Sequence, residues 1–275
     1  MTEETFTFDC EGEQLLGILH RPDQAPKVGI LMIVGGPQYR VGSHRQFVEY
    51  ARAQCDNGYA VLRFDYRGMG DSEGPFLNFK RAQKDILRAM EELFRQVPSL
   101  TSTVWFGLCD GAAASLMHVP DDPRIRGLML LNPWARNSKT QAQAVVKHYY
   151  RQRLLSSDFW KKLVTGRAQI FESLRSLAGN LSRSVTASKA APQDFRTQML
   201  HGAQRFDGDV LLILSADDLT ANEFRGMVTQ SAEWSAEAKS SKWQWQSVPT
   251  ANHTFANSGE KKIVIDMCSR WLEKL

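Results

Sequence analysis

Residues 104–117 have the sequence VWFGLCDGAAASLM, in which an apolar run leads through a glycine-rich turn into a run of helix formers. This pattern predicts a buried strand, a tight turn and a helix, with Cys109 in the turn. Glycines two residues before and two residues after Cys109 suit such a turn, because larger side chains would crowd its backbone. A helix that begins directly after the cysteine would aim its dipole at the thiol, which favours a thiolate or an oxyanion. Cys109 is therefore a candidate nucleophile.

Short apolar runs alternate with helical patterns along the rest of the chain, which predicts a mainly parallel sheet with helices on both faces. The run VGILMIV at residues 28–34 is almost continuously apolar, as expected of a strand buried on both faces. The first two runs are separated by Glu11 and Gly12 and predict an antiparallel hairpin. Strands are predicted at residues 5–9, 14–20, 28–34, 59–65, 103–106, 127–131, 210–214 and 242–248, and helices at about 45–57, 78–96, 221–238 and 259–274.

An acid and a base follow the candidate nucleophile in the order that hydrolytic triads on such sheets use. Asp217 and Asp218 come directly after the apolar run LLIL at residues 211–214, and His253 lies in the loop after the last predicted strand. The carboxyl ends of parallel strands lie at one edge of a sheet, so these groups are expected near Cys109. The residues predict a triad of Cys109, His253 and either Asp217 or Asp218.

A basic, helical segment rich in Gln, Ser and Ala interrupts the strand pattern. Residues 135–206 contain thirteen Lys or Arg and three Asp or Glu, a net charge of +10, and the remainder of the chain carries −6. We predict a core formed by residues 1–133 and 208–275, with residues 134–207 inserted as a helical lid. Two interpretations of the charge stay open: it attracts an anionic substrate or a membrane surface, or it keeps a solvated lid soluble.

Composition limits the classes of protein to which the chain belongs. Hydrophobic residues make up 43% and charged residues 23%, as in ordinary globular enzymes. No run approaches the roughly 20 apolar residues of a membrane span, and the first residues lack an apolar signal core, so we expect a cytoplasmic protein. We expect Cys10, Cys55 and Cys268 to be buried, and the cysteine spacing suggests no metal site. No nucleic-acid partner is expected, since the basic segment lacks an aromatic recognition module.

The chain resembles the α/β-hydrolase superfamily over nearly its whole length outside the insertion. The resemblance rests on the G-x-C-x-G turn, on the ordered triad, and on R-G-x-G-x-S at residues 67–72, which we interpret as scaffold. It implies the α/β-hydrolase fold, an eight-stranded, mainly parallel sheet with helices on both faces and an inserted lid.

The same resemblance implies roles for individual residues. Relatives commonly carry G-x-x-D after the strand that precedes the acid; Ser215 replaces that glycine, which implies Asp218 as the triad acid. The sequence VGGP at residues 34–37 is similar to an H-G-G-P oxyanion loop, with valine in place of histidine. By this resemblance the backbone N–H groups of Gly36 and Asp110 would form the oxyanion hole.

More narrowly, GLCDGAAAS at residues 107–115, ADDLTANEF at 216–224 and GGPQYRVGSHRQF at 35–47 resemble the exosortase A system-associated hydrolases. This resemblance implies a setting beside exopolysaccharide production and protein sorting in bacteria, and no particular substrate. We expect a hydrolase that cleaves a small-molecule acyl ester or thioester through a Cys-His-Asp triad and an acyl-enzyme, without metal or cofactor. The alternatives are an acyltransferase that uses the same triad and a non-catalytic binding protein on the same fold.

Overall fold

The structure is a computed structural model that describes residues 1–35, 39–136 and 194–275. The chain divides into two compact units, one formed by Met1–Ala135 with Phe195–Leu275 and the other by Arg136–Asp194. The strands of the first unit are β1 (Thr2–Cys10), β2 (Glu13–Arg21), β3 (Val28–Ile33), β4 (Ala60–Phe64), β5 (Ser102–Leu108), β6 (Ile125–Leu131), β7 (Asp209–Ser215) and β8 (Trp243–Val248). Its helices are η1 (Ser43–Arg45), α1 (Gln46–Asp56), η2 (Phe79–Arg81), α2 (Gln83–Gln96), α3 (Asp110–His118), α7 (Phe195–Arg205), α8 (Leu219–Gln230), α9 (Ala232–Glu237) and α10 (Ser258–Leu272).

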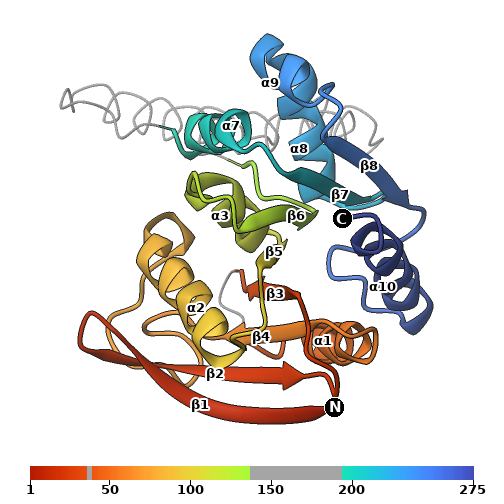
Figure 1. Ribbon diagram of the computed structural model, residues 1–275. Helices are drawn as coiled ribbons and strands as arrows, with labels where there is room; N and C mark the ends of the chain where they lie inside the picture. The colour runs from red at the N-terminus through yellow and green to blue at the C-terminus, as the bar shows by residue number, and fades with distance from the viewer. Residues whose placement is uncertain (36–38, 137–193) are drawn as a thin grey trace, which may run out of the picture. The chain divides into compact units, whose positions relative to one another are not determined.

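The eight strands form one sheet in the order β1-β2-β4-β3-β5-β6-β7-β8 (Figure 1). The pairs β1–β2 and β2–β4 are antiparallel, and every pair from β4 through β3 to β8 is parallel. The prediction of an eight-stranded, mainly parallel sheet and of an opening hairpin is confirmed. All six parallel strands direct their carboxyl ends to one edge, where ligand and catalytic sites form in such sheets.

Helices cover both faces of the sheet, and each face has its own apolar core. Helices α1 and α10 pack on one face and contact each other, while α2, α3 and α8 pack on the other. Strand β5 is buried along its whole length because both of its faces are covered. In the parts of the chain that the structure describes, no helix combines the length and apolarity needed to cross a bilayer.

Two helices, α8 and α9, occur where one helix was predicted at residues 221–238, because the helical backbone is interrupted at Ser231. Ser231 has an extended backbone (φ −106°, ψ 123°), and its side chain accepts a hydrogen bond from the N–H of Trp234 at 3.3 Å. The hydroxyl thereby caps α9 as the chain leaves α8, which is a favoured role of serine at a helix start. A similar difference occurs before α2, where the predicted helix begins as the separate turn η2.

Helix α7 belongs to the core unit, although the sequence placed it in the insertion. It packs against α3 so closely that a side chain at Gly202 would overlap the carbonyl oxygen of Leu116. The compact unit that contains the sheet therefore resumes at Phe195, whereas the sequence placed this boundary after residue 207. Residues 137–193, which contain most of the predicted lid, lie outside the described residues, and the lid stays a prediction.

Candidate active site

Cys109 occupies a strained turn between β5 and α3. Its backbone has φ 60° and ψ −122°, a conformation that non-glycine residues rarely adopt and that clusters at functional sites. The flanking glycines permit the turn: a Cβ on Gly107 would lie 2.6 Å from the backbone nitrogen of Ala112, and one on Gly111 would overlap the carbonyl oxygen of Ile33. The spacing of the two glycines around Cys109 thus follows from close backbone approach on both sides.

Backbone hydrogen bonds from the segment after β6 hold this turn in place. The N–H of Cys109 donates to the carbonyl of Leu131 at 2.9 Å, and its carbonyl accepts from the N–H of Trp134 at 3.0 Å. The Cys109 side chain is half-buried and packs against the apolar core beneath α1 and α10. These contacts supply the support that a strained backbone needs to persist.

Asp218 and His253 form a hydrogen-bonded pair. The Asp218 carboxylate lies 2.9 Å from His253 Nδ1 and also accepts from the N–H of Ala221 at 2.9 Å, so it caps α8. Burial acts to raise the pKa of Asp218, but the hydrogen bonds from His253 and Ala221 outweigh it and the pKa is lowered. The neighbouring Asp217 is exposed, whereas Asp218 is buried. The structure therefore brings Asp218, and not Asp217, to the histidine.

A short segment after β6 connects the loops that carry the three candidate residues. Leu131 accepts the hydrogen bond from Cys109, and the next residue, Asn132, donates from Nδ2 to the carbonyl of His253 at 2.9 Å. The side-chain oxygen of Asn132 accepts from the N–H of Ser215 at 2.8 Å, three residues before the acid. The loops that carry Cys109, Asp218 and His253, here called the nucleophile, acid and base loops, consequently meet at one place on the carboxyl edge of the sheet.

The importance of Asn132 was not identified from the sequence. The available signal was an asparagine directly after an apolar strand, combined with a serine at 215 where the superfamily commonly has glycine. Neither residue by itself suggests a contact, because almost eighty residues separate strand β6 from strand β7 in the sequence. Only their pairing in the sheet brings Asn132 and Ser215 together.

The two predicted oxyanion donors differ in what the structure shows of them. Asp110 is the first residue of α3, where backbone N–H groups point out of the helix without an intrahelical acceptor. Gly36 lies outside the described residues. Its neighbour Gly35 lies against the turn, since a Cβ there would be 2.5 Å from the backbone nitrogen of Gly111 and would overlap the Asp110 carboxylate. The loop that contains Gly36 therefore begins beside the cysteine turn.

The R-G-x-G-x-S turn anchors the chain where that loop ends. The buried carboxylate of Asp65 accepts from the N–H of Arg40 at 2.6 Å and also pairs with its guanidinium, which reaches Asp71 at 2.6 Å. A side chain at Gly70 would overlap the Asp65 carboxylate. These contacts give the turn a structural function, in agreement with its interpretation as scaffold.

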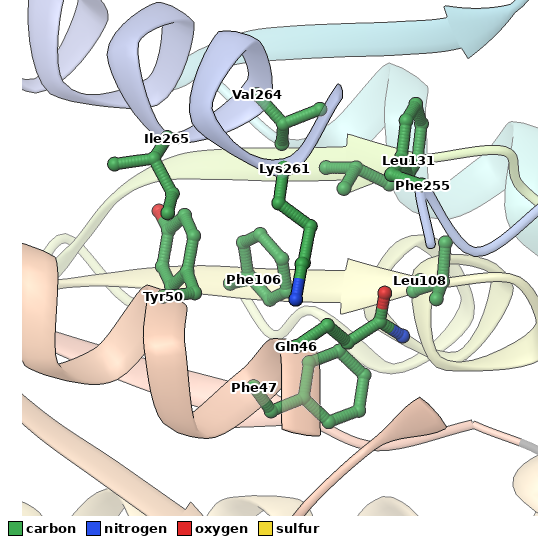
Figure 2. A pocket seen from close by; sticks show the side chains of 10 residues that line it. All are labelled: Gln46, Phe47, Tyr50, Phe106, Leu108, Leu131, Phe255, Lys261, Val264 and Ile265. Carbon is green, nitrogen blue, oxygen red and sulfur yellow. The ribbon is translucent and has the colours of Figure 1, made fainter. Parts of the chain in front are cut away.

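A mostly apolar hollow lies between α1 and α10 (Figure 2). About 320 Å³ of space, open solvent included, lies between its lining side chains. Leu108, which directly precedes Cys109, and Phe255, two residues after His253, both line it. The backs of the nucleophile and base loops are consequently packed in apolar surroundings.

The other three cysteines are buried in the core. Burial raises the pKa of Cys10 to about 11, that of Cys55 to about 11 and that of Cys268 to about 12. Such thiols stay protonated near neutral pH, and the thiolate is the nucleophilic form. Among the residues that the structure describes, no group of three or more His, Cys, Asp or Glu side chains is arranged to hold a metal ion.

These differences predict selective alkylation. With iodoacetamide near pH 6, we expect Cys109 to react at least about tenfold faster than free cysteine, because the histidine of the predicted triad would favour the thiolate. Cys10, Cys55 and Cys268 should remain unmodified in the folded protein. Peptide mass spectrometry of the time course measures all four sites in one experiment. Modification of Cys55 or Cys268 as fast as that of Cys109 would contradict the assignment.

Comparison with solved structures agrees with the fold. An alpha-beta serine hydrolase homologue from Coxiella burnetii is 17% identical, with 99% of this chain and 98% of that chain covered and a TM-score of 0.59. The esterase Pf2001 from Pyrococcus furiosus is 16% identical (99% and 92% covered, TM-score 0.65). Est1E from Butyrivibrio proteoclasticus, solved with ferulic acid bound, is 15% identical (98% and 98% covered, TM-score 0.64). At these identities the likeness concerns the fold alone.

Among curated proteins, an uncharacterized protein of Rickettsia prowazekii is 33% identical over 78 residues. The match covers 28% of this chain and spans a third of the length of that relative. The model of the family described as serine aminopeptidase, S33 (Hydrolase_4) matches residues 27–257, a range that includes Cys109, Asp218 and His253. That description names serine, whereas the turn between β5 and α3 of this chain carries cysteine. The chain belongs to this S33 family of α/β-hydrolases.

Proposed function

We propose that this chain hydrolyses a small-molecule acyl ester or thioester by covalent catalysis at Cys109. The observation that carries the proposal is the combination of a strained cysteine turn at the end of β5 with the Asp218–His253 pair on the same sheet edge. A nucleophile, a base and an orienting acid in these positions are the elements of acyl transfer through a triad. Membership in a hydrolase family supports the reaction class.

In the proposed mechanism His253 takes the Cys109 proton, and the thiolate attacks the acyl carbonyl carbon. Asp218 holds the imidazole through Nδ1 and stabilises its protonated form. Backbone N–H groups of Asp110 and Gly36 are the proposed donors to the oxyanion; losing one such donor typically raises a barrier by about 3 kcal/mol.

Collapse of the tetrahedral intermediate breaks the bond to the leaving alcohol or thiol, which receives the proton from His253. Water then gives its proton to His253 and attacks the acyl-cysteine thioester. A second collapse releases the carboxylic acid and returns the proton to the cysteine sulfur. Atoms and charges balance with water as the sole co-substrate.

The test is a panel of acyl esters and thioesters of increasing chain length, assayed with the purified chain, and with mass spectrometry of the enzyme during turnover. We expect release of the acid together with an acyl mass on the peptide that contains Cys109. If product forms only when an alcohol or amine acceptor is added, the protein is an acyltransferase on the same triad. Absence of both turnover and acylation would favour a binding protein and contradict the proposal.

The cellular setting in this proposal comes from the resemblance to exosortase A system-associated hydrolases, which rests on residues 107–115, 216–224 and 35–47. The proposed setting is bacterial exopolysaccharide production and protein sorting, and the acyl group is left open. Growth and polymer output of a strain that carries an inactive copy would test the setting separately from the chemistry.

The charge of the insertion leads to a prediction about ionic strength. If the net +10 of residues 135–206 attracts an anionic substrate, kcat/KM for that substrate should fall as salt screens exposed charges beyond about 8 Å. A small neutral ester should respond little. Replacing Arg151 and Arg153, which lie outside the described residues, with glutamine should mimic salt and raise KM more than it lowers kcat. Values of kcat/KM independent of ionic strength for acidic substrates would indicate that the charge serves solubility.

A further inference from the structure

Asn132 is fully buried and uses its side chain to join two loops of the candidate site. Its Nδ2 group donates to the hydroxyl of Ser215 and to the carbonyl of His253, both at 2.9 Å. Its Oδ1 atom accepts from the N–H of Ser215 at 2.8 Å. Both protons of the amide and its oxygen are therefore engaged: the oxygen binds Ser215, and the nitrogen binds both Ser215 and His253.

Ser215 extends this connection to a second carbonyl of the base loop. It is fully buried, and its hydroxyl accepts from Asn132 while donating to the carbonyl of Asn252 at 2.9 Å. The carbonyls of two consecutive residues, Asn252 and His253, are thus held by one buried pair. Glycine at 215 would keep the backbone bond to Asn132 and would lose both hydroxyl bonds, so the serine adds a contact that the superfamily's common G-x-x-D pattern lacks.

The base loop also has hydrogen bonds of its own, which connect its backbone carbonyls to the segment that carries the His253 imidazole. The Asn252 side chain accepts from the N–H groups of Thr254 and Ala256, both at 3.1 Å, and closes a compact turn around His253. The side-chain bond to Asp218 fixes one point on the imidazole, and the carbonyl bonds fix the backbone from which the ring extends.

We propose that Asn132 and Ser215 are positioning residues for His253, and that their hydrogen-bonded pair sets the place of the catalytic base relative to Asp218 and Cys109. This inference rests on the proposed function, since it assigns His253 the part of general base. Asn132 is suited to the site for a second reason: its φ of 42° is a left-handed value that asparagine adopts more readily than most residues. Its own N–H donates to the carbonyl of Ile213 at 3.1 Å, which ties it to β7.

The experiment compares Asn132→Gly, Ser215→Ala and the double variant with the wild type. Glycine removes the side chain without penalising the positive φ, so strain does not confuse the result. We expect kcat to fall about 100-fold for Asn132→Gly and about tenfold for Ser215→Ala, with KM nearly unchanged, because a displacement of about 1 Å in a catalytic group has effects of this size. The double variant should be little worse than Asn132→Gly, since the residues act through one connection.

The pH profile of Cys109 alkylation separates positioning from simple stability. In the Asn132→Gly and Ser215→Ala variants its midpoint should move toward that of free cysteine, because a displaced histidine stabilises the thiolate less. The matched control is Gln54→Ala, which removes the hydrogen bond of 2.9 Å from the buried Gln54 on α1 to Ser269 on α10. That variant should have a lower Tm and an unchanged midpoint of the Cys109 alkylation profile.

Three results would overturn the inference. The first is that Asn132→Gly and Ser215→Ala fold and have the same kcat and the same alkylation midpoint as the wild type. The second is an equal midpoint shift in Gln54→Ala. If Asn132→Gly does not fold, Ser215→Ala decides the matter alone. The third is a wild-type Cys109 that reacts no faster than free cysteine, which would overturn the proposed function as well; the first two leave that function standing.

Discussion

Cys109→Ala is expected to abolish acyl-enzyme formation and to lower kcat by about 10⁴- to 10⁶-fold, because removal of a triad nucleophile leaves only binding and oxyanion stabilisation. The fold should survive. Alanine fits the space of the half-buried cysteine, meets the same backbone strain at φ 60°, and keeps the backbone bonds to Leu131 and Trp134. Circular dichroism and Tm check the fold, and burst kinetics with mass spectrometry check the chemistry.

Cys55→Ala is the matched control, since it removes a buried thiol that has no part in the proposed mechanism. It should lose some stability through the vacated volume and retain wild-type turnover. An acyl group trapped on another residue in the wild type, or full activity in Cys109→Ala, would refute the nucleophile assignment. Cys109→Ser tests a different point: low activity there would indicate a site tuned to a thiolate, which needs less help from a base than an alcohol does.

Asp218→Asn is expected to lower kcat by about 10³- to 10⁴-fold, whereas Asp217→Asn should change it less than about threefold. In the proposed mechanism the carboxylate of Asp218 accepts a hydrogen bond from the Nδ1–H of His253 and stabilises the imidazolium, and an amide carries no charge that could do so. Asparagine remains a good helix cap, so α8 should still begin at this position and the fold should persist. Side-by-side kinetics of the two variants, with Tm for each, measure the difference.

The two neighbouring acids make this comparison unusually direct. They differ by one position, carry the same charge, and differ in that Asp218 is buried against His253 while Asp217 is exposed. General electrostatic effects of a nearby carboxylate would therefore appear in both variants. Equal losses, or a larger loss at Asp217, would show that the hydrogen bond at 2.9 Å is not the basis of the acid's function.

Local patterns in the sequence were sufficient to predict the sheet and the cysteine turn. Strands buried on both faces need almost continuous apolar residues, and β3 and β7 carry them. The turn at Cys109 needs glycines two residues away on each side, and these can be identified directly in the sequence. Both requirements act over a few residues, so they leave a readable pattern. The breaks at Ser231 and before α2 were missed because serine and polar residues also occur within helices.

Tertiary structure decided the features that depend on residues distant in the chain. The residues alone did not decide whether Asp217 or Asp218 is the candidate acid. Burial of Asp218 and its hydrogen bond to His253, which follows β8, distinguish the two. The assignment of α7 to the core depends on close packing with α3, although the composition of α7 matches that of the basic segment. The Asn132–Ser215 pair arises where β6 and β7 end side by side. Hydrogen bonds between such loops depend on angles and distances that local sequence does not encode, because the sheet as a whole sets them.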